Sequence, residues 1–183
     1  MSCFISSGVA LGCSDGIGGI KKIYVLGSSG STASVTGVTY SGASVSAPIT
    51  GITGDGTWYS FELKRNTSSL AQNTTKNFEN GTIYWEQVLT AVLFKYDQDK
   101  RNILLELGLN DKLKVVAIDQ NDTQYYLGQV NGMYLSGGSA ATGTAFGDRN
   151  GFELVLTGQE AKPASVVDGD LATIFAAGGF SVA

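Results

Sequence analysis

Alternating apolar and polar positions along the chain predict a protein built mainly of β-strands. Residues 20–26 and 57–64 each alternate between two faces. The longest alternating segment runs from Gly81 to Tyr96, and both of its faces are apolar in its second half. At about 3.3 Å per residue this segment would extend roughly 50 Å, well beyond the usual strand length in globular domains. We therefore expect one strand that outgrows a small β-sandwich.

Shorter strands are expected before and after this segment. The 30 residues from Gly27 to Gly56 include 19 Gly, Ser or Thr residues, but β-branched residues recur among them and predict two short strands joined by a hairpin. Residues 66–80 are polar and residues 136–143 are small, so both stretches are expected to be loops. Three more strands are predicted at residues 113–118, 124–130 and 151–158.

One helix is predicted, over about residues 97–109. Asp97 can cap its first turn, and apolar residues follow at helical spacing before Gly108. The fold class is thus mainly β with one flanking α-helix. Glycine-rich sequence at the start and Ala- and Gly-rich sequence at the end predict extended terminal arms, which gives three parts: an N-terminal arm over residues 1–19, a β-rich domain over 20–160 and a C-terminal arm over 161–183.

Composition narrows the possible partners. Only 15% of the 183 residues are charged, so much of the surface is neutral, as expected for an exterior that faces another protein. The formal net charge is −4, and tight binding of nucleic acid needs clustered Lys and Arg. No stretch approaches the roughly 20 apolar residues of a membrane span. We therefore expect protein partners, no membrane and no nucleic-acid-gripping surface.

The two cysteines, Cys3 and Cys13, are expected to be free and buried. The first residues contain neither a basic region nor a sustained apolar region, so no signal peptide is predicted. Folding in a reducing cytoplasm favours thiols over a disulfide. A bridge between the two would close only a short loop.

Catalytic, cofactor and metal sites are not predicted. The chain contains no His, which removes the commonest general base and the commonest metal ligand, and no Gly-rich run ends in Gly-Lys-Ser/Thr. Two carboxylate pairs could bind calcium or act on glycosides, but turn formation and a mobile tail explain them more simply. These pairs are Asp119 with Asp122 and Asp168 with Asp170.

Aromatic residues offer a second candidate surface. They could form a platform on which sugars stack, although packing in a core or an interface is the simpler interpretation. The residues are Trp58, Tyr59, Trp85, Tyr125, Tyr126 and Tyr134.

Residues 143–160, GTAFGDRNGFELVLTGQE, resemble the closing motif of tail tube and related virion proteins from phages of Bacteroidetes-type hosts, including crAss-like phages. Other segments agree with that family in the same order: Cys13 to Lys21, Phe61 to Thr67, and the Arg101-Asn102 pair of the predicted helix. The resemblance covers roughly residues 1–167.

The resemblance implies a structural virion protein with a tube-forming β-barrel or sandwich. Such proteins assemble into six-fold rings whose long strands join into one inner barrel, and the rings stack around the channel through which DNA passes. Copies of the chain and other tail proteins would be its partners, and the terminal arms would reach neighbouring rings. The protein would be located in the virion tail after assembly in the host cytoplasm.

Particular residues follow from this reading. Asp148 and Arg149 lie in a charged turn between Gly147 and Gly151, where they could contact another subunit or simply form a turn before a strand. An acidic lumen would repel phosphates and let DNA slide, and candidates to line it are Asp55, Glu62, Glu79 and Glu86. The alternative function, based on the aromatic residues, is a capsid decoration or carbohydrate-binding β-sandwich module.

Overall fold

The computed structural model describes residues 8–9, 15–27, 34–42 and 47–183, and the fold is mainly β with two sheets and two helices. The first sheet contains β1 (Ile20–Gly27), β2 (Ser34–Tyr40), β3 (Ile49–Asp55), β4 (Thr57–Glu62), β7 (Val115–Asp119), β8 (Gln124–Leu127), β11 (Ser165–Val167) and β12 (Ser181–Val182). The second contains β5 (Ser69–Asn77), β6 (Thr82–Phe94), β9 (Met133–Ala141) and β10 (Gly151–Glu160). The helices are α1 (Gln98–Gly108) and α2 (Leu171–Ala177).

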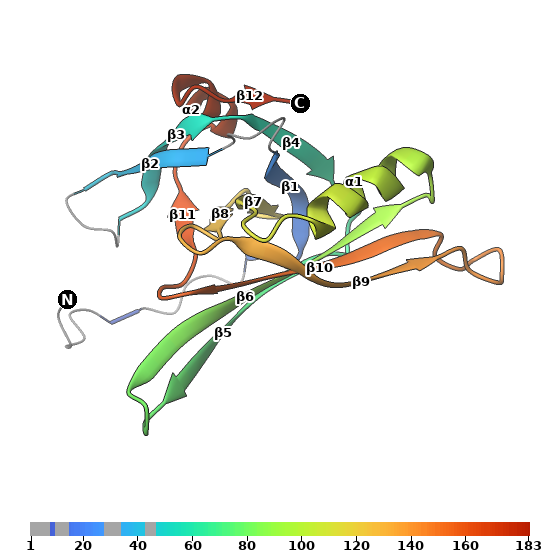
Figure 1. Cartoon of the computed structure of the whole chain (residues 1–183), viewed down its shortest axis with the longest axis horizontal. Coiled ribbons are helices and arrows are strands. Elements are labelled where there is room, and N and C mark those ends of the chain that lie inside the picture. Colours follow the sequence, from blue (N-terminus) through green and yellow to red (C-terminus); the bar gives the residue numbers. More distant parts are fainter. Residues whose placement is uncertain (1–7, 10–14, 28–33, 43–46) are drawn as a thin grey trace.

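The first sheet curls into a half-barrel. Its strand order is β12-β4-β1-β7-β8-β11-β3-β2, so β3 and β4 stand far apart in the sheet. Only Gly56 separates them in sequence, and its φ of 129° is a conformation that favours glycine. The chain therefore turns sharply at Gly56 and bends the sheet back on itself (Figure 1).

The central strands of the half-barrel are buried on both faces. Val115 and Val116 are neighbours on β7 and point to opposite faces, yet both are fully buried. Val115 belongs to a core between the two sheets that also includes Leu89 and Leu154. Val116 belongs to a second core inside the curl, with Trp58 and other apolar residues. Each sheet thus covers the other, and the half-barrel has a core of its own.

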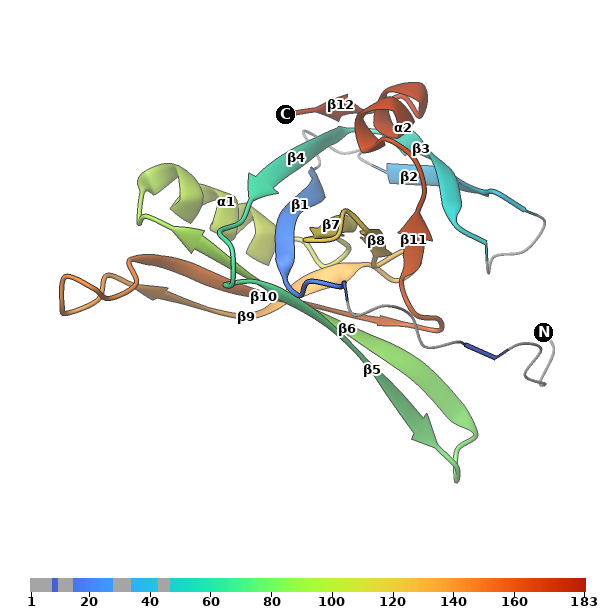
Figure 2. The same cartoon turned by 180° about the vertical axis from the view of Figure 1, so that it is seen from behind.

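The second sheet is fully antiparallel and longer than the body of the molecule. Its order is β5-β6-β10-β9. The predicted long strand is confirmed as β6, with 13 residues, and it pairs with β10 from Gly151–Phe94 to Glu160–Trp85. Figures 1 and 2 show the β5–β6 hairpin projecting from one side of the body and the β9–β10 connection from the other.

The predicted loops at residues 66–80 and 136–143 are wrong. Most of the first is β5, and most of the second belongs to β9. Both strands lie at the edges of the sheet and are largely exposed on both faces. Without a buried face they lack the apolar alternation that reveals a strand in sequence.

The predicted C-terminal arm is also wrong, because residues 165–182 are folded onto the half-barrel. β11 pairs with β8 and β3, and β12 pairs with β4. Between them, α2 carries Phe175, which is fully buried and stacks on Trp58 with ring centroids 4.6 Å apart. Asp170 caps α2 by accepting from the Thr173 amide at 3.0 Å.

Two further predictions concern the helix and the N-terminal arm. Helix α1 confirms the predicted helix to within a residue at each end, with Asp97 as its N-cap. The N-terminal arm, with Cys3 and Cys13, lies mostly outside the described residues; of its described residues, Gly8 and Val9 are exposed.

Candidate assembly surface

The second sheet ends in two edge strands of equal length. β5 and β9 each contain nine residues, and among the described residues the only pairing outside the sheet is a bridge from Leu113 to Met133 at the start of β9. The two strands contain no Pro, and Lys76 is their only charged residue. Charges, prolines and short lengths are the usual protections of a sheet edge. Apart from the start of β9, which Leu113 occupies, these edges are open to pairing with another strand among the described residues.

The directions of the edge strands suit cyclic repetition. Neighbours in β5-β6-β10-β9 are all antiparallel, so β5 and β9 run in opposite directions. If copies repeat around an axis along the strands, β9 of one copy meets β5 of the next in antiparallel orientation. The hydrogen-bonding ladder can then continue from copy to copy, with an interruption where β9 has an irregularity between Leu135 and Gly137.

The second sheet has an outer face that points away from the core. On β6 and β10 the core side carries Leu89 and Leu154, and the alternate residues form the outer face. Of the residues that the four strands place on this face, only Glu86 and Glu153 are charged. Small or neutral residues make up most of the rest: Ser69, Ala71, Asn73, Thr75, Val88, Thr90, Val155, Thr157 and Gln159.

The four acids predicted to line a lumen do not lie together. Glu86 is on the outer face of β6, opposite Gln159 of β10, and Glu79 is in the exposed turn between β5 and β6. Asp55 and Glu62 are at the ends of β3 and β4 in the other sheet. Only Glu86 therefore belongs to the outer face.

Asp148 and Arg149 have separate partners within the chain. The Asp148 carboxylate accepts from the amides of Thr144 and Ala145, each at 2.8 Å. These bonds fix the turn and hold the pKa of Asp148 below its ordinary value. Arg149 donates to Glu153 at 2.7 Å, on the outer face. Within one chain, the two residues organise the connection from β9 to β10.

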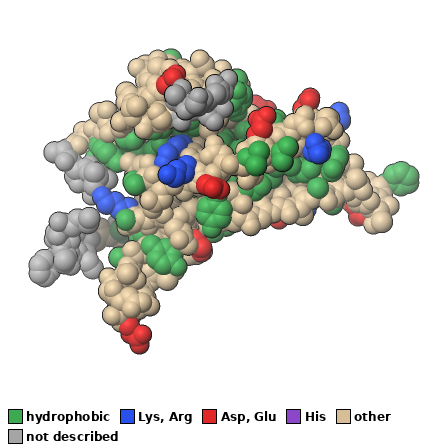
Figure 3. All heavy atoms as spheres, in the orientation of Figure 1, with side chains coloured by type: hydrophobic (Ala, Val, Ile, Leu, Met, Phe, Trp, Pro, Cys, Tyr) green, Lys and Arg blue, Asp and Glu red, His purple; other side chains and the backbone are tan. Residues whose placement is uncertain are grey.

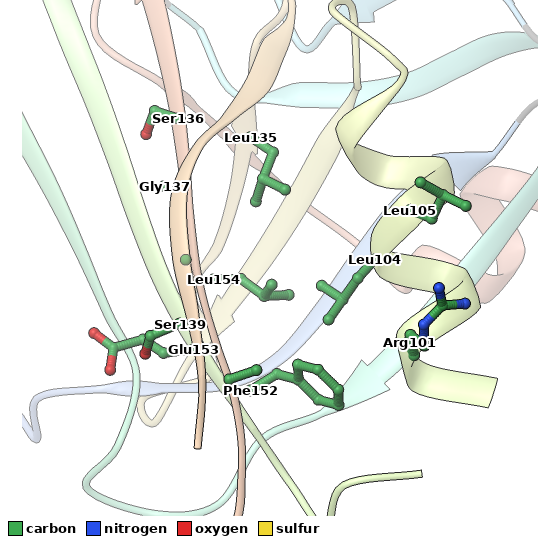
Figure 4. Close-up of a pocket in the computed structure, with 12 residues that line it drawn as sticks. Arg101, Leu104, Leu105, Leu135, Ser136, Gly137, Ser139, Phe152, Glu153 and Leu154 are labelled. Carbon is green, nitrogen blue, oxygen red and sulfur yellow. The ribbon is translucent and has the colours of Figure 1, made fainter. Parts of the chain in front are cut away.

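A groove lies between α1 and strands β9 and β10 of the second sheet. It has a volume of about 500 Å³ and is lined by α1 residues, including Leu104 and Leu105, and by parts of β9 and β10. Figure 4 shows Leu104 pointing from α1 toward Leu154 and Phe152, whereas Glu153 points away on the opposite side of the sheet. We call this the helix–strand groove.

Helix α1 is sparsely covered. Leu107 is its only buried residue, and Leu105 is 59% exposed. A second groove, of about 880 Å³, lies between the end of α1 and strands β1 and β4 and includes Leu109 and Tyr59. Figure 3 shows apolar side chains gathered over α1 on the visible face. An apolar patch next to an open edge is typical of a protein interface.

The β5–β6 hairpin projects apolar residues into solvent. Phe78 at its tip is 82% exposed, and Ile83 on β6 is 52% exposed. Ile83 precedes Leu89 by six residues on β6, and alternate residues of a strand point to the same face. Ile83 therefore lies on the face that Leu89 directs into the core, but outside the core itself. Among the residues that the structure describes, nothing covers these two apolar side chains.

Buried polar groups hold the loop between β8 and β9. Lys114 donates through Nζ to the carbonyls of Gly128, Gln129 and Val130, at 2.8–3.3 Å. Its burial lowers the pKa of the Lys114 amine. Glu160 is buried and accepts from the Val130 amide at 2.9 Å. These contacts fix the loop that leads into the edge strand β9.

The other candidate sites become structural in the fold. Trp58 and Tyr126 are fully buried, so the six aromatic residues do not form one exposed platform. Asp119 accepts from the amides of Asn121 and Thr123, each at 2.8 Å, within a turn. Among the described residues, no group of three or more Cys, Asp or Glu could hold a metal ion.

Sequence reasoning missed the edge strands and the helix–strand groove. The absence of Pro and of all but one charge from residues 69–77 and 133–141 is a signal that could have indicated two strands there, although not their place at the edges of the sheet.

No helix in the described part of the chain is long and apolar enough to span a membrane. No family model, no curated protein and no solved structure matches this chain.

Proposed function

We propose that this chain is a structural virion protein that forms the tube of a phage tail. Copies join through their second sheets, with β9 of one copy pairing with β5 of the next, and close into a ring. The observation that carries the proposal is the pair of open edges, equal in length and opposite in direction. Closure removes both edges, which would otherwise invite disordered aggregation.

A ring built this way has a lumen lined by strands. Six copies of the four-stranded sheet contribute 24 strands. At about 4.8 Å per strand, the backbone barrel would be roughly 37 Å across, and wider with strand tilt. If the outer face lines this barrel, its strands bring acids and neutral residues to the channel, and Arg149, which also lies on this face, is paired with Glu153. Such a lining would attract phosphates only weakly, so DNA could pass without being held.

Rings would stack along the strand direction to form the tube. The β5–β6 turn and the β9–β10 connection project on opposite sides of the body, so each ring would present a different set of tips to each neighbour (Figure 2). Other tail proteins would bind at the two ends of the tube, where these tips remain free.

Electron microscopy of the negatively stained, purified protein tests the proposal. Rings or tubes of uniform width are expected, with sedimentation velocity showing large species that grow with concentration. Monodisperse monomers under every condition of salt, pH and concentration would contradict it. A stable monomer that binds glycans on an array would favour the carbohydrate-binding alternative.

A further inference from the structure

Three Asn-Gly pairs occur in the chain, and the surroundings of one differ from those of the other two. They are Asn80-Gly81 in the β5–β6 turn, Asn131-Gly132 before β9, and Asn150-Gly151 at the start of β10. Asparagine is a thermolabile residue. It is most reactive before glycine, because glycine has no Cβ to hinder the approach to its backbone nitrogen. Each pair is therefore a candidate site of chemical change.

The reaction at such a pair is intramolecular. The backbone nitrogen of the glycine attacks the side-chain amide carbon of the asparagine. A C–N bond forms, and the side-chain nitrogen leaves as ammonia with the proton of the backbone nitrogen. Water then opens the resulting five-membered imide at either carbonyl, which leaves aspartate or isoaspartate. The side chain must therefore be free to turn, and the glycine nitrogen must be free to approach it.

Both requirements fail at Asn150. Its side-chain Oδ1 accepts a hydrogen bond from the amide of Tyr96 at 3.0 Å. Gly151 is buried and pairs on both sides, with Phe94 of β6 and Ala141 of β9. The strands on either side therefore hold the glycine backbone in place.

Asn131 is held in a similar way. Its side-chain Nδ2 donates to the carbonyl of Gln159 at 2.7 Å, and its backbone amide donates to Glu160 at 2.8 Å. Gly132 is buried, and a Cβ on it would lie 2.6 Å from the Cα of Lys112. The surrounding backbone leaves this glycine no room to move toward the asparagine side chain.

Asn80 differs in every one of these respects. In the part of the chain that the structure describes, its only hydrogen bond runs from its backbone amide to Oδ1 of Asn77, at 3.1 Å, and its side-chain amide makes none. Gly81 is exposed, has a φ of 63°, and has no atom within 4 Å of where a Cβ would be. The turn thus leaves both reacting groups free.

We propose that Asn80 is a site of spontaneous deamidation, in which the nitrogen of Gly81 closes onto the Asn80 side chain, and that the fold protects Asn131 and Asn150. The product adds a negative charge to the hairpin tip beside Glu79, and isoaspartate also lengthens the backbone of the turn by one carbon. The inference does not depend on the proposed tube, because it concerns the folded single chain.

Mass spectrometry of the folded wild-type chain tests the inference. The protein is incubated at mildly alkaline pH in water enriched in heavy oxygen, which labels each new carboxylate, and is then digested and sequenced by tandem mass spectrometry. The peptide that contains Asn80 should become labelled as aspartate and isoaspartate. The peptides that contain Asn131 and Asn150 should react at least about tenfold more slowly, because they must wait for local opening of the fold.

The same chain in urea is the matched control. Without the fold, all three pairs should react at similar rates, and Asn80 should react about as fast as it does in the folded chain. Asn80→Gln keeps an amide but would need a six-membered ring, so this variant should not become labelled at the tip. The inference is overturned if folded Asn80 reacts no faster than Asn131 and Asn150, or if folding slows Asn80 as much as it slows the other two.

Discussion

Aromatic stacking attaches the C-terminal segment to the half-barrel. Phe175 lies almost parallel to Trp58, with 9° between the ring planes, and Phe180 meets Trp58 edge-on with centroids 5.7 Å apart. All three side chains are buried. Aromatic pairs of this kind contribute about 0.5–1.5 kcal/mol beyond their buried area. The segment therefore belongs to the folded body.

Val92 gives the clearest prediction at the scale of one residue. It is 5% exposed on β6 and pairs with Glu153 across the sheet. Val92→Asp buries a carboxylate beside the half-buried Glu153, and we expect a loss of at least about 3 kcal/mol in the free energy of unfolding. Urea denaturation measures it. Val130→Asp is the control, since Val130 is 76% exposed and should change stability little; equal effects of the two substitutions would contradict the placement of β6.

The turn at Asp148 predicts a dependence on pH. Its hydrogen bonds to Ala145 and Thr144 lower the pKa of Asp148 from the ordinary value of 3.8. The stabilisation is therefore present above pH 3.8 and lost as the pH falls through the lower pKa of the folded state. Thermal unfolding of the wild type and of Asp148→Asn should differ at neutral pH and converge in acid. A difference that is independent of pH would show that the carboxylate charge plays no part.

At the scale of elements, the edge strands can be tested with a pair of proline variants. Successive residues of a strand direct their N–H groups to opposite sides, so Asn73 and Thr74 on β5 differ in whether the N–H faces β6 or the open edge. Proline removes that N–H. The variant that loses an N–H facing β6 should unfold the hairpin. The variant that loses an N–H facing the open edge should keep the melting temperature of the wild type but should not assemble.

Circular dichroism measures the melting temperature of each proline variant, and sedimentation velocity measures its assembly. The variant with the intact melting temperature is the informative one, because its defect is confined to the outer edge of β5. Rings from that variant would contradict the pairing of β5 with another copy.

The sequence was sufficient for elements that bury a face. β6, β10 and α1 were predicted because Leu89, Leu154 and Leu107 recur with apolar neighbours at strand or helix spacing. β5 and β9 were not, because both strands are largely exposed and their polarity is that of a loop. α2 was missed because its buried Leu171, Ile174 and Phe175 lie among Ala and Gly residues that resemble a flexible tail.

The candidate site could not be predicted from the sequence, because it depends on how the strands are arranged in space. Sequence placed Asp148 and Arg149 in a turn but did not separate their partners. The sequence predicts Glu86, Glu62 and Asp55 alike as residues that line a lumen. The fold places Glu62 and Asp55 in the other sheet. No local pattern reveals which strands end a sheet, since order in a sheet is set by long-range pairing.

At the scale of the whole molecule, the two sheets differ in how completely the described residues cover them. The half-barrel is covered by α2 and β12 and has a core of its own. The second sheet extends beyond it, and within the described ranges its two edge strands are largely exposed, as are Ile83 on the hairpin and Leu105 on α1. A folded body whose second sheet ends in two exposed edge strands is suited to assembly from folded subunits.

Reconstruction of the assembled particles by electron cryomicroscopy is the most direct test of the central claim. The account predicts a closed ring in which β9 of each copy lies antiparallel to β5 of the next, at about 4.8 Å, with one unbroken barrel around the lumen. Particles joined through the first sheet, or protein that remains monomeric at every concentration, would contradict it.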